Sequence, residues 1–281
     1  MIRDITPSIP SPLPFVEVTG SEIFYRQWTA ETAKAAVIII HGLGEHSGRY
    51  VDLGEYLASS GYDVYAIDLR GHGRSAGRRG CIGRFEDFVM DLEKLLCKIG
   101  DERIFLLGHS LGSLITIEYV LKHEVSGFII SGLTLGGGRA LGFLGSVPVL
   151  NSIPIPLGEI LTFFLGKRAI RSLCSNEMAL DKYLKDDLAH GKITLKLLGE
   201  LSEESERIRE GANSIVSPVL VLIGEEDHMG NVEDAKWFYD NVSSDKKDII
   251  VYRGMKHNIF DEVDREEVFS DVLRWLEENK G

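Results

Sequence analysis

The distribution of apolar residues along the chain predicts eight strands. Two of them, FVEVT (15–19) and EIFYRQW (22–28), lie close enough in sequence to form an antiparallel hairpin across Thr19–Gly20–Ser21. The other six are AAVIII (35–40), YDVYAI (62–67), RIFLL (103–107), GFII (127–130), VLVLI (219–223) and DIIVY (248–252). Near-continuous apolar runs such as AAVIII are typical of parallel strands that are buried on both faces.

Between most of these strands, apolar residues return at helical spacing. The clearest case is FEDFVMDLEKLLCKIG (85–100), which ends at a glycine suited to terminating a helix. Its apolar stripe consists of Phe85, Phe88, Val89, Leu92, Leu95 and Leu96. Further helices are expected within 49–61, 111–123, 232–242 and 264–278. This alternation predicts an α/β fold with a mostly parallel eight-stranded sheet and helices on both faces.

One long segment interrupts the alternation. Between Gly132 and Pro218 the chain runs for more than eighty residues, far more than a strand-to-helix connection requires. Its first part, 141–166, carries a single charge and is long enough to cross a membrane, but three prolines argue against an unbroken span. We therefore predict a helical cap, or lid, inserted after the sixth strand. The expected division is a core of 1–131 and 215–281 and a cap of 132–214.

Charge and cysteine content narrow the possible partners. With 31 Lys and Arg against 43 Asp and Glu, the net charge of −12 disfavours binding to nucleic acid and to anionic membrane surfaces. Three widely separated cysteines without a C-x-x-C pair, and a first segment unlike a signal peptide, predict a cytoplasmic protein. The apolar cap still allows transient contact with a lipid interface. The oligomeric state is left open.

The motif G-x-S-x-G, found in many serine hydrolases, occurs twice. Ser75 lies in GHGRSAG (71–77) and Ser110 lies in GHSLG (108–112). A nucleophilic serine of this type sits on a tight turn between a strand and a helix, where flanking glycines leave room and the helix N-terminus faces developing negative charge. Ser110 follows RIFLL and precedes a predicted helix, whereas Ser75 precedes AGRRGCIGRF, which is typical of a loop. The sequence therefore predicts Ser110 as the nucleophile.

A serine nucleophile needs a general base that is itself oriented by a carboxylate. On this type of sheet the acid and then the histidine should follow the serine, each just beyond a strand end. The loop GEEDHMG after VLVLI offers three acids, of which Asp227 lies deepest in the loop. His257 is the only histidine after the last strand. We predict a triad of Ser110, Asp227 and His257.

Two main-chain N–H groups are expected to bind the oxyanion that forms during acyl transfer. One belongs to Leu111, directly after the nucleophile, and the other to Leu43 in the loop HGLGEHSG (41–48) that follows AAVIII. The four histidines at 41, 46, 72 and 109 lack the spacing of a metal site, so no metal is expected.

Taken together, HGLGEHSGRY, DLRGHGRSAGRRG, GHSLGS, GEEDH and HNIFDE resemble the monoacylglycerol lipase and lysophospholipase group of the α/β-hydrolase superfamily. The resemblance extends from about residue 15 to the C-terminus and includes NEMALDKYLKDDL (176–188), which is similar to that group's cap. It implies an α/β-hydrolase fold, hydrolysis of a small lipid ester without a cofactor, and a polar pocket for the alcohol part near Glu45 and Arg49. Ser113 departs from the group, which usually has glycine at this position.

Four other activities remain open at this point. A general carboxylesterase or a thioesterase with short-to-medium acyl preference would use the same triad. A cofactor-free haloperoxidase or a peptidase would perform different chemistry on the same fold. A non-catalytic binding protein could also retain the fold.

Overall fold

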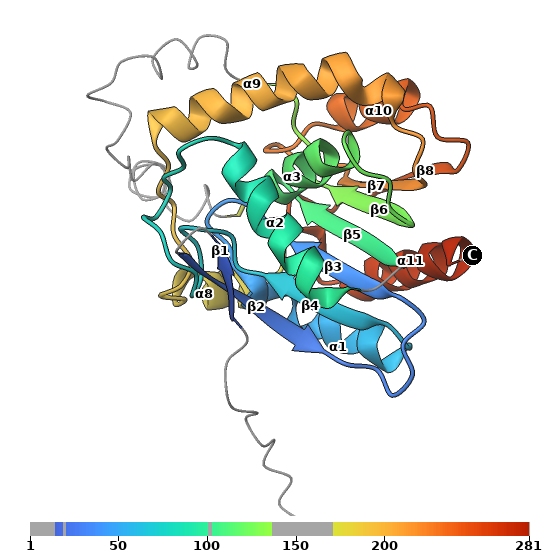
Figure 1. The fold of residues 1–281 in the computed structure, drawn as a ribbon, viewed down its shortest axis with the longest axis horizontal. Helices are drawn as coiled ribbons and strands as arrows, with labels where there is room; N and C mark the ends of the chain where they lie inside the picture. The colour runs from blue at the N-terminus through green and yellow to red at the C-terminus, as the bar shows by residue number, and fades with distance from the viewer. Residues whose placement is uncertain (1–14, 19–20, 101–102, 137–170, 281) are drawn as a thin grey trace, which may run out of the picture.

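The computed structural model describes residues 15–18, 21–100, 103–136 and 171–280. It contains one eight-stranded sheet in the order β1-β2-β4-β3-β5-β6-β7-β8 (Figure 1). The strands are β1 (Phe15–Val18), β2 (Ser21–Trp28), β3 (Ala36–Ile40), β4 (Asp63–Ile67), β5 (Ile104–His109), β6 (Gly127–Ser131), β7 (Val219–Gly224) and β8 (Lys247–Tyr252). All eight strands were predicted from the apolar pattern. Only the β1–β2 and β2–β4 pairs are antiparallel, so the mostly parallel α/β-hydrolase sheet is confirmed.

The sheet order reverses at β3. The chain passes from β3 to β4 on one side and then returns to β5 on the other side of β3. Where the strand order reverses, the loops after the two central strands diverge and leave a crevice at their carboxyl ends. The loops after β3 and β5 are the ones that carry Leu43 and Ser110.

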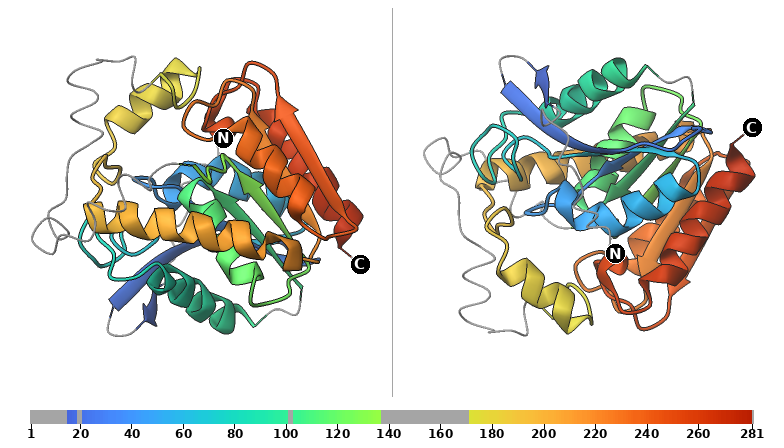
Figure 2. Two further views of the ribbon diagram at one scale, coloured as in Figure 1. Left: turned by 90° about the horizontal axis from the view of Figure 1, so that it is seen from above. Right: turned by 90° about the horizontal axis from the view of Figure 1, so that it is seen from below.

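Helices cover both faces of the sheet. One face carries α2 (Glu86–Ile99), α3 (Leu111–Val120) and α10 (Val232–Asn241), and the other carries α1 (Val51–Ser59) and α11 (Arg265–Asn279), as the two views of Figure 2 show. The α2 helix is amphipathic, and it ends at Gly100 in a left-handed conformation with φ 65°. Its buried stripe matches the predicted one. Two buried clusters, one on each face, form the core.

The described part of the insertion after β6 consists of helices joined by turns and loops. It contains α8 (Glu177–Leu184), α9 (Leu195–Gly211) and the short 3₁₀ helix η2 (Ala212–Ser214). Leu197 and Ile208 of α9 are buried in the same cluster as α3, so α9 packs directly against the core. The apolar segment 141–166 lies outside the described residues, and the proposed boundaries at 132 and 214 remain predictions.

The 3₁₀ helices η1 (Ser47–Tyr50) and η3 (Ile259–Asp261) follow the loops after β3 and β8. Among the described residues, no helix has both the length and the apolar character needed to span a bilayer.

Candidate active site

Ser110 occupies a strained turn between β5 and α3. It adopts φ 53° and ψ −115°, and within the described part of the chain it is the only residue other than glycine with a positive φ. Such a conformation is costly for a residue with a side chain and is found where a functional group must be held in an unusual place. Ser110 immediately precedes the first turn of α3 and is half-buried.

The two flanking glycines are required by close backbone contacts. A Cβ atom at Gly108 would lie 2.3 Å from the carbonyl oxygen of Gly112, and one at Gly112 would lie 2.0 Å from that of Ile40 in β3. Both distances are far below a possible carbon–oxygen contact. The glycines therefore let α3 begin directly against β3, as the motif predicted.

Ser113, the departure from the related group, has a structural place in this turn. Its buried hydroxyl lies 2.9 Å from the carbonyl oxygen of Gly108 and 2.8 Å from that of Ser131, donates its one proton between them, and accepts from the N–H of Ser131 at 3.1 Å. Because Gly108 belongs to β5 and Ser131 to β6, this side chain ties the ends of two strands beneath the turn.

His257 and Asp227 form a buried pair. His257 Nδ1 lies 2.9 and 3.0 Å from the two carboxylate oxygens of Asp227, and the side chains are 4 % and 0 % exposed. Asp227 also accepts from the main-chain N–H groups of Met229 and Gly230. Burial alone would raise the pKa of Asp227, but its hydrogen bond to His257 and the other bonds lower it below the ordinary value. Glu225 and Glu226 point to solvent, which leaves Asp227 as the acid that reaches the histidine.

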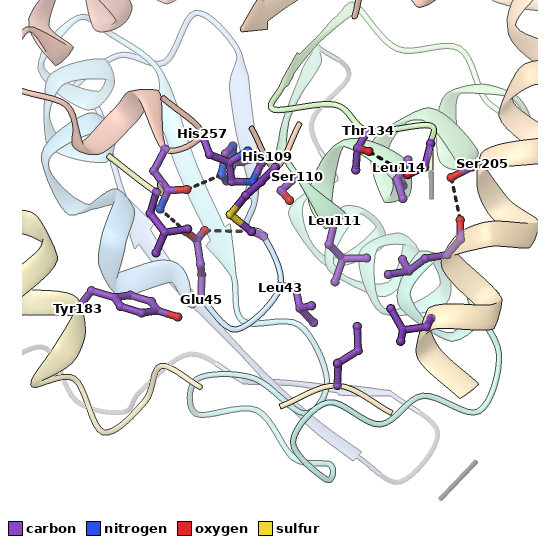
Figure 3. A pocket seen from close by; sticks show the side chains of 18 residues that line it. Leu43, Glu45, His109, Ser110, Leu111, Leu114, Thr134, Tyr183, Ser205 and His257 are labelled. Carbon is purple, nitrogen blue, oxygen red and sulfur yellow. Dashed lines mark hydrogen bonds between the residues drawn. The ribbon is translucent and has the colours of Figure 1, made fainter. Parts of the chain in front are cut away.

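Ser110 and His257 line the same cavity, whose volume is about 310 Å³ (Figure 3). The rings of His257 and His109 both lie against Gly132, and a Cβ at Gly42 would lie 3.2 Å from the Cβ of Ser110. Among the described residues the Ser110 hydroxyl has no hydrogen-bond partner. Bonds of this kind often tighten only when substrate is bound. The hydroxyl is thus free to point at a ligand, beside an oriented imidazole.

The expected oxyanion donors also border this cavity. Leu43 lies in the loop after β3, and Leu111 is the first residue of α3. Neither main-chain N–H donates to any described residue. Two free N–H groups beside a serine hydroxyl can stabilise an oxyanion, because the donors are in place before the charge develops.

Most of the remaining cavity wall is apolar. Figure 3 shows Leu111 and Leu114 extending from Ser110 toward Ser205 of α9. The apolar wall is formed by Leu43, Leu111, Leu114, Leu173, Ile193, Leu198, Leu201 and Met229. Because Leu198 and Leu201 belong to α9, the insertion contributes directly to the pocket.

Glu45 and Arg49 have different positions relative to the cavity. Glu45 lines it, but its carboxylate accepts from the N–H of Gly42 at 3.2 Å and the hydroxyl of Tyr50 at 3.1 Å. Arg49 is not part of the lining; it lies beside Glu45, pairs with Asp261 and places its guanidinium 4.8 Å from the ring of Tyr183. Burial would raise the pKa of Glu45, but the positive charge of Arg49 and the other partners lower it to about 2.

The sequence reasoning assigned no role in the site to three polar side chains of the cavity wall, those of His109, Asn258 and Tyr183. His109 and Asn258 are buried beside the triad, and Tyr183 comes from α8 of the insertion. The signal for the first two was their position next to Ser110 and His257, but neighbours of functional residues often point away. Tyr183 had no local signal. In the part of the chain that the structure describes, no group of three histidine, cysteine or acidic side chains could hold a metal.

Comparisons with known proteins agree with this geometry. The pattern of the serine aminopeptidase S33 family matches residues 31–264. A monoacylglycerol lipase of Mycolicibacterium smegmatis is 29 % identical, over 93 % of this chain and 95 % of that protein. A Bacillus subtilis protein named phospholipase YtpA is 31 % identical, over 86 % and 95 % of the two chains.

A solved structure gives the same result in three dimensions. The crystal structure of a monoacylglycerol lipase from Paleococcus ferrophilus superposes with a TM-score of 0.79 at 29 % identity, and covers 92 % of this chain and 99 % of that one. These matches confirm the resemblance noted in the sequence. The chain belongs to the serine aminopeptidase S33 family of the α/β-hydrolase superfamily.

Proposed function

We propose that the protein is a carboxylic ester hydrolase that cleaves fatty-acyl esters of the monoacylglycerol or lysophospholipid type through an acyl-enzyme on Ser110. The observation that carries the proposal is the Ser110 hydroxyl, which lies at a positive-φ turn beside the buried His257–Asp227 pair and has no hydrogen-bond partner in the described part of the chain. The relatives named as a monoacylglycerol lipase and a phospholipase act as the guide to substrate class.

In the first half of the reaction, His257 takes the proton of Ser110 as the hydroxyl oxygen attacks the ester carbonyl carbon. Asp227 accepts from Nδ1 of His257, which leaves Nε2 free to act as the base. The carbonyl oxygen becomes negatively charged and accepts from the N–H groups of Leu43 and Leu111. The tetrahedral intermediate then collapses, His257 gives its proton to the alcohol oxygen, and the alcohol leaves.

In the second half, a water molecule replaces the alcohol. His257 removes a proton from the water as its oxygen attacks the acyl-enzyme carbonyl, and the same two N–H groups stabilise the second oxyanion. Collapse returns the proton to Ser110 and releases the fatty acid. The low pKa of Asp227 keeps its carboxylate ionised, so that the imidazolium formed in each step has a counter-charge.

The apolar wall from Leu111 to Leu201 supports an acyl chain as the apolar part of the substrate. Burial of each methylene contributes about 0.8 kcal/mol, so longer chains should be favoured until the cavity is filled. The polar end, at Glu45 and Tyr183, suits the alcohol part of the ester. Arg49 lies behind these two residues and orients them.

The test is a substrate profile with a fluorophosphonate label as the active-site titrant. Fatty-acid release would be measured from a monoacylglycerol and a lysophosphatidylcholine, p-nitrophenol release from p-nitrophenyl esters ranging from acetate to palmitate, and p-nitroaniline release from an aminoacyl p-nitroanilide. We expect turnover of the first two and preference for longer esters, with no activity in Ser110→Ala. Turnover of acetate esters alone would favour a general carboxylesterase, and anilide cleavage would favour a peptidase. Failure of the wild type to label would exclude a serine hydrolase.

A further inference from the structure

Each part of the proposed machinery has a buried neighbour in sequence, and two of these three neighbours have polar side chains. His109 precedes Ser110, Asn258 follows His257, and Gly42 precedes Leu43. Asn258 is 3 % exposed and His109 is 1 % exposed, so neither can rely on solvent for its hydrogen bonds. A buried asparagine must find its partners within the protein.

Asn258 links His109 to Glu45. Its Nδ2 donates to Glu45 Oε1 at 2.9 Å, and its Oδ1 lies 3.2 Å from His109 Nε2. Glu45 in turn accepts from the N–H of Gly42 through Oε2 at 3.2 Å. A continuous set of buried hydrogen bonds therefore runs from the neighbour of the nucleophile, past the neighbour of the base, to the loop that carries the Leu43 donor.

The chemistry of Glu45 determines the direction of these bonds. An ionised carboxylate can only accept, so the amide of Asn258 must present its NH₂ group to Glu45 and its oxygen to His109. His109 Nε2 must then donate, and its Nδ1 accepts from the Ser131 hydroxyl at 2.8 Å. Burial lowers the pKa of His109 to about 4, which is consistent with a neutral ring held in this single tautomer.

We propose that Asn258 is a positioning residue. Through its hydrogen bonds to Glu45 and His109, it fixes the loop that carries the Leu43 N–H relative to the Ser110 turn. This inference rests on the proposed function, since it concerns the same ester hydrolysis. Asn258 itself need not touch the reacting atoms. Its amide is the one group in the described network that can donate to a carboxylate on one side and accept from an imidazole on the other.

Asn258→Ala tests the role directly. The wild type and the variant would be compared for hydrolysis of a p-nitrophenyl ester, with the concentration of active sites set by fluorophosphonate titration. Loss of the link should let the donor loop shift without changing the apolar wall, so we expect kcat to fall roughly 10- to 100-fold while KM changes little. A purely structural role would lower the melting temperature and leave kcat per active site unchanged, which would overturn the proposal.

A polarity swap provides the second test. Asn258→Asp places a second carboxylate against Glu45, so kcat at neutral pH should fall below that of Asn258→Ala. When Glu45→Gln is added to Asn258→Asp, the introduced amide can donate to the introduced carboxylate, so the hydrogen bond is restored with donor and acceptor exchanged. The kcat of this double variant should be about tenfold higher than that of Asn258→Asp alone. If the double variant folds and is no faster than Asn258→Asp, the proposed link is wrong. This comparison remains decisive even if Asn258→Ala does not fold.

Ser75→Ala is the matched control, because it also removes a buried polar side chain with two hydrogen bonds, but one that is not part of the cavity lining. It should lower stability and leave kcat near the wild-type value. The behaviour of the wild type distinguishes failure of the proposed function from failure of the role proposed for Asn258. If it neither labels nor hydrolyses esters, the proposed function fails; if it does both and Asn258→Ala matches it, only the role of Asn258 fails.

Discussion

The two G-x-S-x-G turns share a sequence pattern, but their serine hydroxyls differ in their surroundings: one is hydrogen-bonded within the protein, and the other faces the cavity. In the Ser75 turn (Gly73–Gly77), the hydroxyl donates to the carbonyl oxygen of Asp68 and accepts from the N–H of Phe24. It therefore ties the loop after β4 to β2. In the Ser110 turn (Gly108–Gly112), the hydroxyl has no partner among the described residues and faces the cavity.

The backbone explains this difference. Ser75 has an ordinary φ and is followed by a loop, so its side chain can turn inward to satisfy buried main-chain groups. Ser110 adopts a positive φ at the direct passage from β5 into α3, and its side chain lines the cavity. The comparison teaches that a hydroxyl becomes a candidate nucleophile when the fold leaves its hydrogen-bonding capacity unused.

The largest expected contrast between the turns is in activity. Ser110→Ala removes the attacking oxygen and should lower ester hydrolysis by at least about 10³-fold. Ser75→Ala should leave kcat per folded molecule close to wild type, because the first turn contributes nothing to the cavity wall. Initial rates on a p-nitrophenyl ester measure both. Greater loss in Ser75→Ala than in Ser110→Ala would reverse the assignment of the two turns.

The glycines should show the next largest contrast. Gly112→Ala places a methyl group 2.0 Å from the carbonyl oxygen of Ile40, so α3 must move away from β3. We expect a loss of about 3 kcal/mol in unfolding free energy, together with most of the activity. Urea unfolding followed by tryptophan fluorescence would measure the first effect.

Gly77→Ala is the counterpart in the first turn. Gly77 has φ 111° and its Cβ would lie 2.8 Å from the N of Gly71, so stability should fall here as well. The folded fraction should retain the wild-type kcat. If Gly112→Ala behaves in the same way, the geometry of the Ser110 turn is not needed for catalysis.

The pH dependence of stability should also distinguish the turns. Glu45 supports the loop opposite Ser110, and its folded pKa of about 2 lies below the ordinary 4.5. The resulting stabilisation is present above pH 4.5 and is lost as the pH falls toward 2, up to about 3 kcal/mol. The stability difference between wild type and Glu45→Gln should therefore shrink over this range.

Ser75→Ala provides the comparison for that experiment. It removes neutral hydrogen bonds only, so its cost should stay constant between pH 5 and pH 2. Urea unfolding at a series of pH values would measure both variants. A difference for Glu45→Gln that did not change with pH would show that the carboxylate is not stabilised as an ion in the folded state.

The smallest effects concern stability at neutral pH. Ser75→Ala leaves the buried N–H of Phe24 without its acceptor and should cost about 2 kcal/mol. Ser110→Ala removes a hydroxyl that bonds to none of the described residues, and should change stability by less than about 0.5 kcal/mol. Thermal unfolding of the two variants measures the difference. Equal losses would indicate that the Ser110 hydroxyl is bound in the folded protein after all.

Much of the fold could be predicted because the signals are local. AAVIII and VLVLI are apolar on both faces, and the stripe within 85–100 has helical spacing, so each segment shows its own structure. The site could be predicted in part for the same reason. Ser110 lies between a strand and a helix, and His257 is the only histidine after the last strand.

Other parts of the site could not be predicted, because they depend on contacts between distant segments. Glu45 and Asn258 are 213 residues apart in sequence, and Tyr183 of α8 meets Arg49 of η1 only in the folded chain. Arg49 was expected in the polar pocket, yet it lies beside that pocket rather than in its wall.

The sequence alone determined the order of strands and helices and the turn that carries Ser110, and it singled out the proposed acid and base. These features depend on apolar periodicity and on the steric needs of glycine, which act over a few residues. Only the tertiary structure decided which polar side chains form hydrogen bonds with one another and which remain available to a ligand. That outcome depends on burial, because a group removed from water must bond to whatever distant partner the packing brings to it.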